Sequence, residues 1–274
     1  MTSNQRYDMG TTDYKIGIIG LNTCVGTHDG SHKVLQCIKR AKRQNLDLLV
    51  GPEWSLMAFY SSTKRLSPKE IVDLYAENYP TASTAPIKSN SFLPYSPHEA
   101  RKLINLLKKA TKGSDMVVMP GTMMLYTNVR KLYNVMPIFK DGRLIYSVLK
   151  NSDGGSSDFD VRGLLSFKHP TPKRAYSFEE NAIKFGIEIC ADTGTLAASL
   201  KPHSLDIQVL SAAGVRKTDT DALKETGFLV CSDGAMDSDA RYVRNARSVD
   251  IPASFMDDDL AVYRLRLETS ADKV

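Results

Sequence analysis

Short apolar runs recur along this chain, and their lengths constrain its fold more than any other feature. Clear examples are residues 14–21, 47–50, 115–120, 183–189 and 205–210. Each run is short and is followed by turn residues, which is typical of buried β-strands. Segments with helical spacing of apolar residues separate some of these runs. The alternation predicts an α/β fold in which helices cover sheets.

Three helices are predicted from periodicity and from their start signals. Residues 31–44 place apolar side chains at helical spacing between the first two strands. The sequences Ser67-Pro68-Lys69-Glu70 and Ser96-Pro97-His98-Glu99 are both capping boxes, in which the serine and the glutamate satisfy backbone N–H groups at a helix start. We expect the helix after the second capping box to end near Gly113.

A hairpin is predicted between residues 132–139 and 144–149, because Asp141-Gly142 separates two apolar runs. An antiparallel hairpin next to strand–helix–strand units indicates mixed sheets. Residues 151–160 are rich in Gly, Ser and Asp, which predicts a loop over a site or at the surface. Residues 251–274 are expected to form a short strand pair and a charged tail.

The length of 274 residues allows one large domain or two small ones. No segment resembles a linker, so we predict a polar leader at residues 1–13 and a single domain at residues 14–274. No apolar run approaches the roughly 18 residues of a membrane helix, and the N-terminus lacks the apolar stretch of a signal peptide. We therefore expect a cytoplasmic protein that does not associate with membranes.

The net charge of +5 is modest, and its densest cluster is Lys39, Arg40, Lys42 and Arg43. We interpret this cluster as a solvated helix face and expect no nucleic-acid partner. The four cysteines, Cys24, Cys37, Cys190 and Cys231, form no Cys-x-x-Cys pair and have no histidine at zinc-ligand spacing. No metal or other cofactor is expected, and packing in the core explains each cysteine except Cys190.

Cys190 ends the apolar run 183–189 and precedes a predicted helix at residues 196–200. Strict alternation would place it on the same face as Glu188. A strand end that leads into a helix exposes a side chain at the rim of an α/β layer, near unbonded backbone N–H groups. This position suits a nucleophile, although a packed thiol is the alternative.

Glu53 and Lys150 also follow apolar runs. Glu53 comes after residues 47–50 and the turn Gly51-Pro52, next to Trp54, the one tryptophan of the chain. Lys150 directly follows the run 144–149. Taken singly, Glu53 could cap the next segment, and Lys150 could extend its amine to solvent from a strand end.

Glu53, Lys150 and Cys190 together resemble the catalytic set of the nitrilase superfamily of carbon–nitrogen hydrolases. The resemblance is carried by DLLVGPEW at residues 47–54, YNVMPIFKDGRLIYSVLK at 133–150, FGIEICAD at 185–192 and LDIQVLSAAG at 205–214. It spans residues 14 to about 214. The resemblance implies a four-layer αββα sandwich with mixed sheets, which associates into homodimers or higher homo-oligomers.

The resemblance implies a thiol-dependent hydrolase of a non-peptide C–N bond, in an amide, carbamoyl compound or nitrile, and the chemistry of the three residue types is compatible with that reaction. Glu53 would accept the thiol proton and return it to the departing amine. Protonated Lys150 is expected to stabilise the thiolate and, with the N–H group of Ala191, the oxyanion. The intermediate would be a thioester on Cys190.

Two departures from the family pattern bear on the pocket. The family has a second glutamate shortly after its lysine, whereas residues 151–178 contain none. Asp153, Asp158, Asp160 or Glu188 could replace it, although Glu188 could instead pair with a lysine. Small polar residues at 193–195 also replace the family's usual bulkier run. The aromatic side chains of Trp54, Phe59, Tyr60 and Tyr126 are candidates for the pocket wall or for the core.

Two alternative functions remain open on the sequence. An amine could capture the acyl group, which would make the protein an acyltransferase or an amide-forming enzyme. The missing second glutamate is instead compatible with a catalytically silent binding protein of the same fold. In each case the expected ligand is a small molecule of the amide type.

Overall fold

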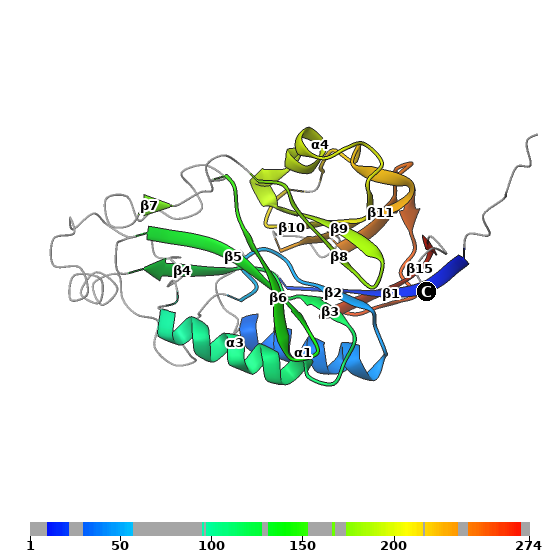
Figure 1. The fold of residues 1–274 in the computed structure, drawn as a ribbon. Helices are drawn as coiled ribbons and strands as arrows, with labels where there is room; N and C mark the ends of the chain where they lie inside the picture. The colour runs from blue at the N-terminus through cyan, green and yellow to red at the C-terminus, as the bar shows by residue number, and fades with distance from the viewer. Residues whose placement is uncertain are drawn as a thin grey trace, which may run out of the picture.

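The computed structural model describes residues 10–21, 30–56, 95, 97–127, 131–152, 166–167, 174–215, 217–234 and 241–269. Two β-sheets pack face to face, and helices lie outside them (Figure 1). Both sheets mix parallel and antiparallel strands. This arrangement confirms the predicted α/β class and the αββα order of layers.

The larger sheet contains β1 (Gly10–Ile19), β2 (Leu48–Val50), β3 (Val117–Met119), β4 (Met123–Thr127), β5 (Lys131–Lys140), β6 (Arg143–Leu149), β7 (Ser166–Phe167), β14 (Phe255–Met256) and β15 (Leu260–Thr269). Its main path runs β14-β15-β1-β2-β3-β5-β4, and β6 and β7 pair with β5. The strands β1, β2 and β3 are parallel, so β2 is enclosed by neighbours and carries only buried residues.

The smaller sheet contains β8 (Tyr176–Glu180), β9 (Ile183–Ile189), β10 (Leu205–Ala212), β11 (Leu223–Asp233), β12 (Arg241–Asn245) and β13 (Asp250–Ile251). Its order is β13-β12-β11-β10-β9-β8, with β9, β10 and β11 parallel. The parallel strands bring the carboxyl ends of β9 and β10 to one edge of this sheet.

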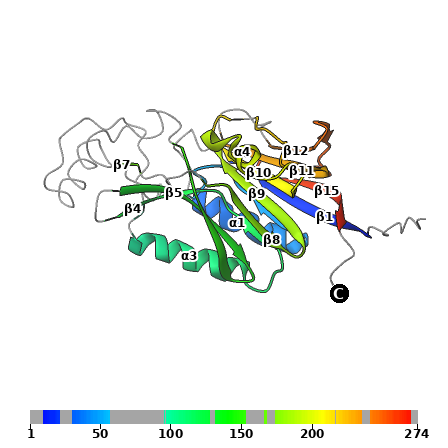
Figure 2. The same ribbon diagram turned by 45° about the horizontal axis from the view of Figure 1, so that its top comes forward.

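The helical layers are unequal. Helices α1 (Gly30–Arg43) and α3 (Pro97–Thr111) lie side by side on the outer face of the larger sheet, as Figures 1 and 2 show. Outside the smaller sheet lies α4 (Thr195–Ser199), which follows the 3₁₀ turn η1 (Cys190–Asp192). No helix within the described ranges is long and apolar enough to cross a membrane.

The main core lies between the two sheets. It contains Ile16, Ile18, Leu48 and Val50 from the larger sheet and Phe185, Ile187 and Val209 from the smaller one. A second core under the helices contains Val34, Ile38, Leu103, Leu107 and Phe139. Each large aliphatic side chain buried in this way contributes about 1.5–3 kcal/mol, so these two layers hold the strand ends in place.

Most predicted elements are present with small shifts at their ends. Helix α3 begins at Pro97, and Gly113, just beyond its end, has φ +72°, which suits glycine. Asp141 and Gly142 both have positive φ and connect β5 to β6 as a two-residue hairpin turn. The helix predicted after Ser67 and most of the loop predicted at 151–160 lie outside the described residues.

The predicted start of the domain is wrong by four residues. Strand β1 begins at Gly10 instead of Tyr14, because residues 10–13 pair through their backbones with residues 266–269 of β15. Backbone pairing needs no apolar side chains, so the polar composition concealed it. The strand pair predicted within residues 251–274 is present as β14 and β15, but β15 is a ten-residue strand that also pairs with β1. Residues 1–9 lie outside the described residues, so a leader there stays a prediction.

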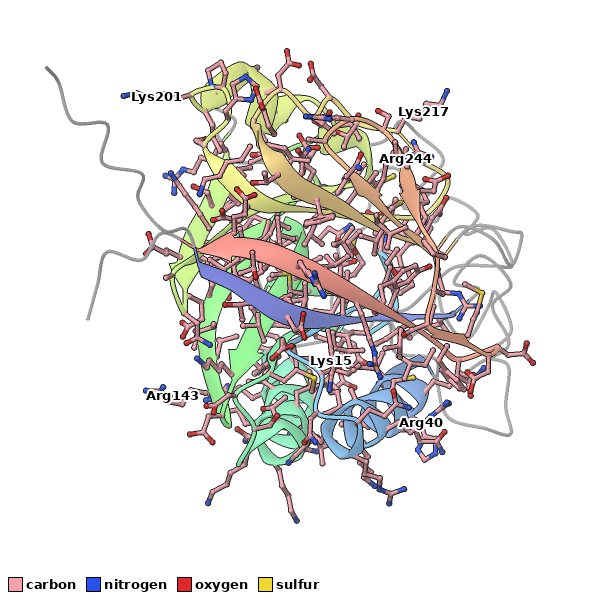
Figure 3. All side chains as sticks on the ribbon, turned by 90° about the vertical axis from the view of Figure 1, so that its right-hand side faces the viewer. Lys15, Arg40, Arg143, Lys201, Lys217 and Arg244 are labelled. Atoms are coloured by element: carbon pink, nitrogen blue, oxygen red, sulfur yellow. The ribbon has the colours of Figure 1, made fainter. Side chains whose placement is uncertain are left out.

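The basic face of α1 has partners within the protein. Arg40 pairs with Asp257, and Lys33 Nζ lies 3.2 Å from an oxygen of Asp259. Lys42 donates through Nζ to the backbone oxygen of Lys112 at 2.6 Å, beyond the end of α3. Figure 3 shows Arg40 at the outer edge of the helical layer. These contacts join α1 to its neighbours, so Arg40 and Lys42 of the basic cluster bind within the protein and are not simply solvated.

Candidate active site

Glu53 is held at the end of β2 by contacts that cross to the other sheet. The Ser211 hydroxyl on β10 donates to the Gly51 carbonyl oxygen at 2.9 Å, and the Glu53 N–H donates to the Ala212 oxygen at 3.2 Å. A Cβ on Gly51 would lie 2.4 Å from the backbone oxygen of Pro120, so this close approach requires glycine. The ends of β2 and β10 therefore meet, with the Glu53 side chain fully buried between them.

Lys150 forms a buried ion pair with Glu53. Its Nζ lies 2.7 Å from Glu53 Oε1, and neither side chain is exposed. Asn134, on β5, donates through Nδ2 to the same oxygen at 2.7 Å, and its backbone oxygen accepts the Lys150 N–H at 3.0 Å. Burial of two charges is costly unless each is paired and hydrogen-bonded. The cationic and amide donors offset that cost for Glu53.

Cys190 approaches this pair from the smaller sheet. It follows β9 with φ +47°, a left-handed conformation that is uncommon for a residue with a Cβ, and it opens η1, in which its carbonyl accepts the Thr193 N–H at 3.2 Å. The thiol lies close enough to the Glu53 carboxylate, the Lys150 amine and the Ala213 N–H for each of them to shift its pKa. The structure thus brings together Glu53, Lys150 and Cys190 from the ends of three strands.

The electrostatics of the thiol differ from the sequence expectation. Burial is the largest effect and, with the Glu53 charge, raises the pKa of Cys190 to about 12, while Lys150 and the Ala213 N–H lower it. The predicted stabilisation of the thiolate by Lys150 is therefore present but outweighed. At neutral pH Cys190 is therefore a neutral thiol beside the Glu53 carboxylate.

Glu188 does not share a face with Cys190 as alternation predicted, because the left-handed turn at Cys190 breaks the two-residue period and turns the thiol toward the core between the sheets. Glu188 is buried and accepts the Leu196 N–H at 3.0 Å, the Gln208 amide at 3.1 Å and the Thr218 hydroxyl. Burial raises its pKa, and these donors oppose the shift. Glu188 therefore fastens α4 to the smaller sheet, away from the face that holds Glu53.

The remaining predicted residues lie around this cluster or outside the described part. Trp54 follows Glu53 with φ +65°, is buried, and donates its backbone N–H to Thr122 Oγ1 at 2.8 Å. Ala191 is the second residue of η1, where the first N–H groups of a turn are not used by its own hydrogen bonds. Asp158 and the side chain of Tyr126 lie outside the described residues, as do Asp153, Asp160, Phe59 and Tyr60.

Sequence reasoning missed four contributors to the site. Asn134 and Ala213 contact Glu53 and Cys190 respectively, and Asp192 hydrogen-bonds to Asn151, the residue after Lys150. Asn134 and Asp192 lie within the segments that resemble the family, and this position was the only sequence feature that could have identified them. Ala213 acts through its backbone N–H, so its side chain could not have indicated a role. Within the described ranges, no group of three His, Cys, Asp or Glu side chains is placed to hold a metal ion.

Comparison with known proteins yields fold similarity. No protein-family model matches the sequence, and no curated protein sequence matches it either. Among solved structures, a mutant of the Nesterenkonia AN1 amidase from the nitrilase superfamily matches with a TM-score of 0.61 and 10% identity, covering 92% of this chain and 90% of the amidase. Nit3 from Saccharomyces cerevisiae, a member of branch 10 of the nitrilase superfamily, has a TM-score of 0.58, 17% identity and coverages of 92% and 90%. The chain has the carbon–nitrogen hydrolase fold.

The same fold also occurs within larger enzymes. The glutamine-dependent NAD⁺ synthetase from Acinetobacter baumannii matches with a TM-score of 0.59 and 15% identity. The match covers 96% of this chain and 48% of the synthetase, so this chain spans about half of that enzyme's length. The predicted resemblance to the nitrilase superfamily is confirmed for the carbon–nitrogen hydrolase fold, at identities between 9% and 17%.

Proposed function

We propose that this protein hydrolyses a non-peptide C–N bond of a small molecule through a covalent thioester on Cys190. The observation that carries the proposal is the convergence of a thiol, a carboxylate and an amine from three strand ends into one buried cluster. Neither packing nor folding requires these three groups to meet, since buried charges cost free energy that apolar side chains would not. The solved amidases of the same fold support the same class of reaction.

In the first half of the reaction, the Cys190 sulfur attacks the amide carbon and its proton passes to Glu53. A C–S bond forms, and the carbonyl oxygen becomes an oxyanion that the Lys150 ammonium and the Ala191 N–H stabilise. Glu53 then gives the proton to the amide nitrogen, the C–N bond breaks, and an amine or ammonia leaves. The acyl group remains on Cys190 as a thioester.

In the second half, water takes the place of the amine. Glu53 accepts a proton from the water, and the hydroxyl adds to the thioester carbon. Collapse of this intermediate breaks the C–S bond and releases the carboxylic acid, while Glu53 returns the proton to the sulfur. One carboxylate thus serves as base and acid in both halves. General acid–base catalysis of this kind typically accelerates a reaction by about 10²–10⁴-fold.

The burial of the Glu53 and Lys150 side chains suits this role. Electrostatic interactions are stronger where water is excluded, so the Lys150 charge acts on an oxyanion with little screening. Asn134 holds Glu53 Oε1 together with Lys150, which fixes the carboxylate before substrate arrives. A preorganised site of this kind does not need to reorient its donors during the reaction.

The test is hydrolysis of a panel of short amides, carbamoyl compounds and nitriles, followed as release of ammonia or amine. We expect at least one substrate class to turn over in the wild-type protein and not in Cys190→Ala. The matched control is Cys231→Ala, which removes another buried thiol of the smaller sheet and is expected to retain activity. Turnover that persists in Cys190→Ala would contradict the mechanism.

The same panel separates hydrolysis from acyl transfer. Product masses are measured with and without a competing amine such as hydroxylamine. Hydrolysis predicts the free acid as the main product in both cases when the amine is at low concentration. An amide or hydroxamate as the dominant product under those conditions would favour an acyltransferase.

A further inference from the structure

Asp192 links the turn of the nucleophile to the strand of the lysine. It is the last residue of η1, two positions after Cys190, and its side chain is 2% exposed. Its Oδ2 accepts the backbone N–H of Asn151 at 2.8 Å. Asn151 directly follows Lys150 at the end of β6. One carboxylate therefore joins the smaller sheet to the larger sheet beside the site.

The backbone that carries Lys150 is held from several directions. Asn134 accepts the Lys150 N–H at 3.0 Å, and Asp192 accepts the next N–H along the chain. Asn151 itself exchanges two hydrogen bonds with the backbone of Arg174, at 2.8 and 2.9 Å, just before β8. Among the described residues, the Asp192 contact joins this backbone directly to the turn containing Cys190.

A negative charge at this position is costly, which distinguishes it from an ordinary structural hydrogen bond. Burial raises the pKa of Asp192 to about 6, opposed by the Asn151 N–H, the Lys150 charge and Ser152. Within the described residues, no cation forms a direct ion pair with it. A neutral amide could accept the same N–H at lower cost, so the bond alone does not account for an acid here.

The charged groups around Asp192 come from each neighbouring element. Lys150 lies at the end of β6, and Tyr176 of β8 is close enough for Asp192 to influence it, with Arg174 also acting on Tyr176. Cys190 stands on the same turn as Asp192, with Glu53 and Lys150 beyond it. Among these groups, Lys150 is the buried cation that an ionised Asp192 would attract.

We propose that Asp192 is a positioning residue: its ionised carboxylate draws Lys150 toward the turn of Cys190 and so fixes the position of the amine relative to the thiol. The inference rests on the proposed function and deepens it. It gives the site a second carboxylate that acts on the lysine, in a chain with no glutamate at residues 151–178. The site is then fully competent only while Asp192 is ionised.

The test measures how fast acrylamide or iodoacetamide alkylates Cys190, by peptide mass mapping, and needs no substrate. In a glutamate-to-glutamine mutant of the Nesterenkonia amidase, which has the same fold, acrylamide has added to the active-site cysteine, so acrylamide is a reasonable probe here. Asp192→Asn keeps the shape and the acceptor oxygen but removes the charge. We expect alkylation at pH 8 to slow by about 10- to 100-fold, because Lys150 is misplaced, with an unchanged or higher melting temperature.

The direction of the change is decisive. Loss of a nearby negative charge alone favours the thiolate and would speed alkylation, so an unchanged or faster rate overturns the proposal. Slower alkylation with a lower melting temperature indicates general damage and also overturns it. The matched control is Asp206→Asn, since Asp206 is another buried aspartate that accepts a backbone N–H, from Lys184 at 2.8 Å, but pairs with Lys224 away from the site. Its alkylation rate is expected to match the wild type.

A pH series adds a second readout. The wild-type alkylation rate should fall more steeply below about pH 6, where Asp192 takes up a proton. The Asp192→Asn profile should lack this extra bend, whereas an identical bend in both proteins would contradict the proposal. If no substrate is ever found, these measurements still stand, so failure of the proposed function and failure of the positioning role are distinguishable.

Discussion

Cys190 and Cys231 are both buried in the smaller sheet, yet their surroundings differ in kind. Cys231 lies within β11, opposite Leu210 and Tyr242 of the flanking strands. Cys190 lies just past the end of β9, where a left-handed turn directs its thiol to Glu53 and Lys150. Cys190 is 7% exposed and Cys231 is 0% exposed, so burial does not distinguish them. The difference between the two thiols lies in the backbone turn at Cys190 and in the charged groups beside its sulfur.

The sharpest way to break this comparison is to remove each thiol in turn. Cys190→Ala is expected to lower kcat/KM by at least about 10⁴, because loss of a nucleophile removes the covalent route. Cys231→Ala is expected to lower the melting temperature through a small cavity and to leave kcat/KM within about twofold. Steady-state kinetics and thermal unfolding check both. Equal loss of activity in the two variants would mean that packing, and not nucleophilicity, explains the role of Cys190.

The second prediction concerns the base that faces Cys190. Glu53→Gln keeps the side-chain shape but removes the proton acceptor, so kcat should fall by about 10²–10⁴. The control is Glu180→Gln, which breaks a different ion pair, with Lys140 Nζ at 2.6 Å. That variant should keep its activity. If Glu53→Gln retained wild-type kcat, another group would have to accept the thiol proton.

The third prediction uses stability to compare the fully buried ion pair of the site with one whose lysine is exposed to solvent. Lys150→Met leaves Glu53 buried without its cation and should destabilise the fold by about 3–5 kcal/mol. Lys224→Met disrupts the pair with Asp206, where the lysine side chain is 44% exposed, and should cost at most about 1 kcal/mol. Denaturant unfolding measures both. Similar losses in the two variants would contradict the burial cost assigned to Glu53.

The fourth and smallest effect is a gain in stability at Asp192. The folded-state pKa is raised from 3.8 to about 6, so the stability that this group contributes is present at low pH and is lost as the pH rises through this window. Asp192→Asn removes the penalty and should be more stable than the wild type at pH 7, by as much as about 3 kcal/mol. The advantage should shrink toward pH 4. A difference that is constant across pH would contradict the assigned cause.

Residue patterns predicted much of the fold because each buried strand left an apolar run with a clear end. Those ends also located Glu53, Lys150 and Cys190, since a run that stops at a reactive residue places it at a sheet edge. The polar first residues of β1 and the whole of β12 were not predicted, for the opposite reason. Their residues pair through the backbone or alternate with charged side chains, so no apolar run marks them.

The details of the site were less accessible from the sequence. Glu188 was grouped with Cys190 because a two-residue period was extended one residue too far, into a left-handed turn. Asn134 and Asp192 act across long separations in the chain: the Asn134 contact depends on the strand order of the larger sheet, and the Asp192 contact on how the two sheets stack. The raised pKa of Cys190 follows from its burial next to Glu53. A sequence pattern does not predict how deeply a single side chain is buried or which charge lies beside it.

The most direct test of the account is the mass of the protein quenched in acid during turnover of its best amide substrate. The account predicts that the acyl mass appears on the peptide containing Cys190, that hydroxylamine removes it as expected for a thioester, and that Cys190→Ala shows neither adduct nor turnover. An acyl group found on a different residue, or turnover that continues undiminished in Cys190→Ala, would contradict it.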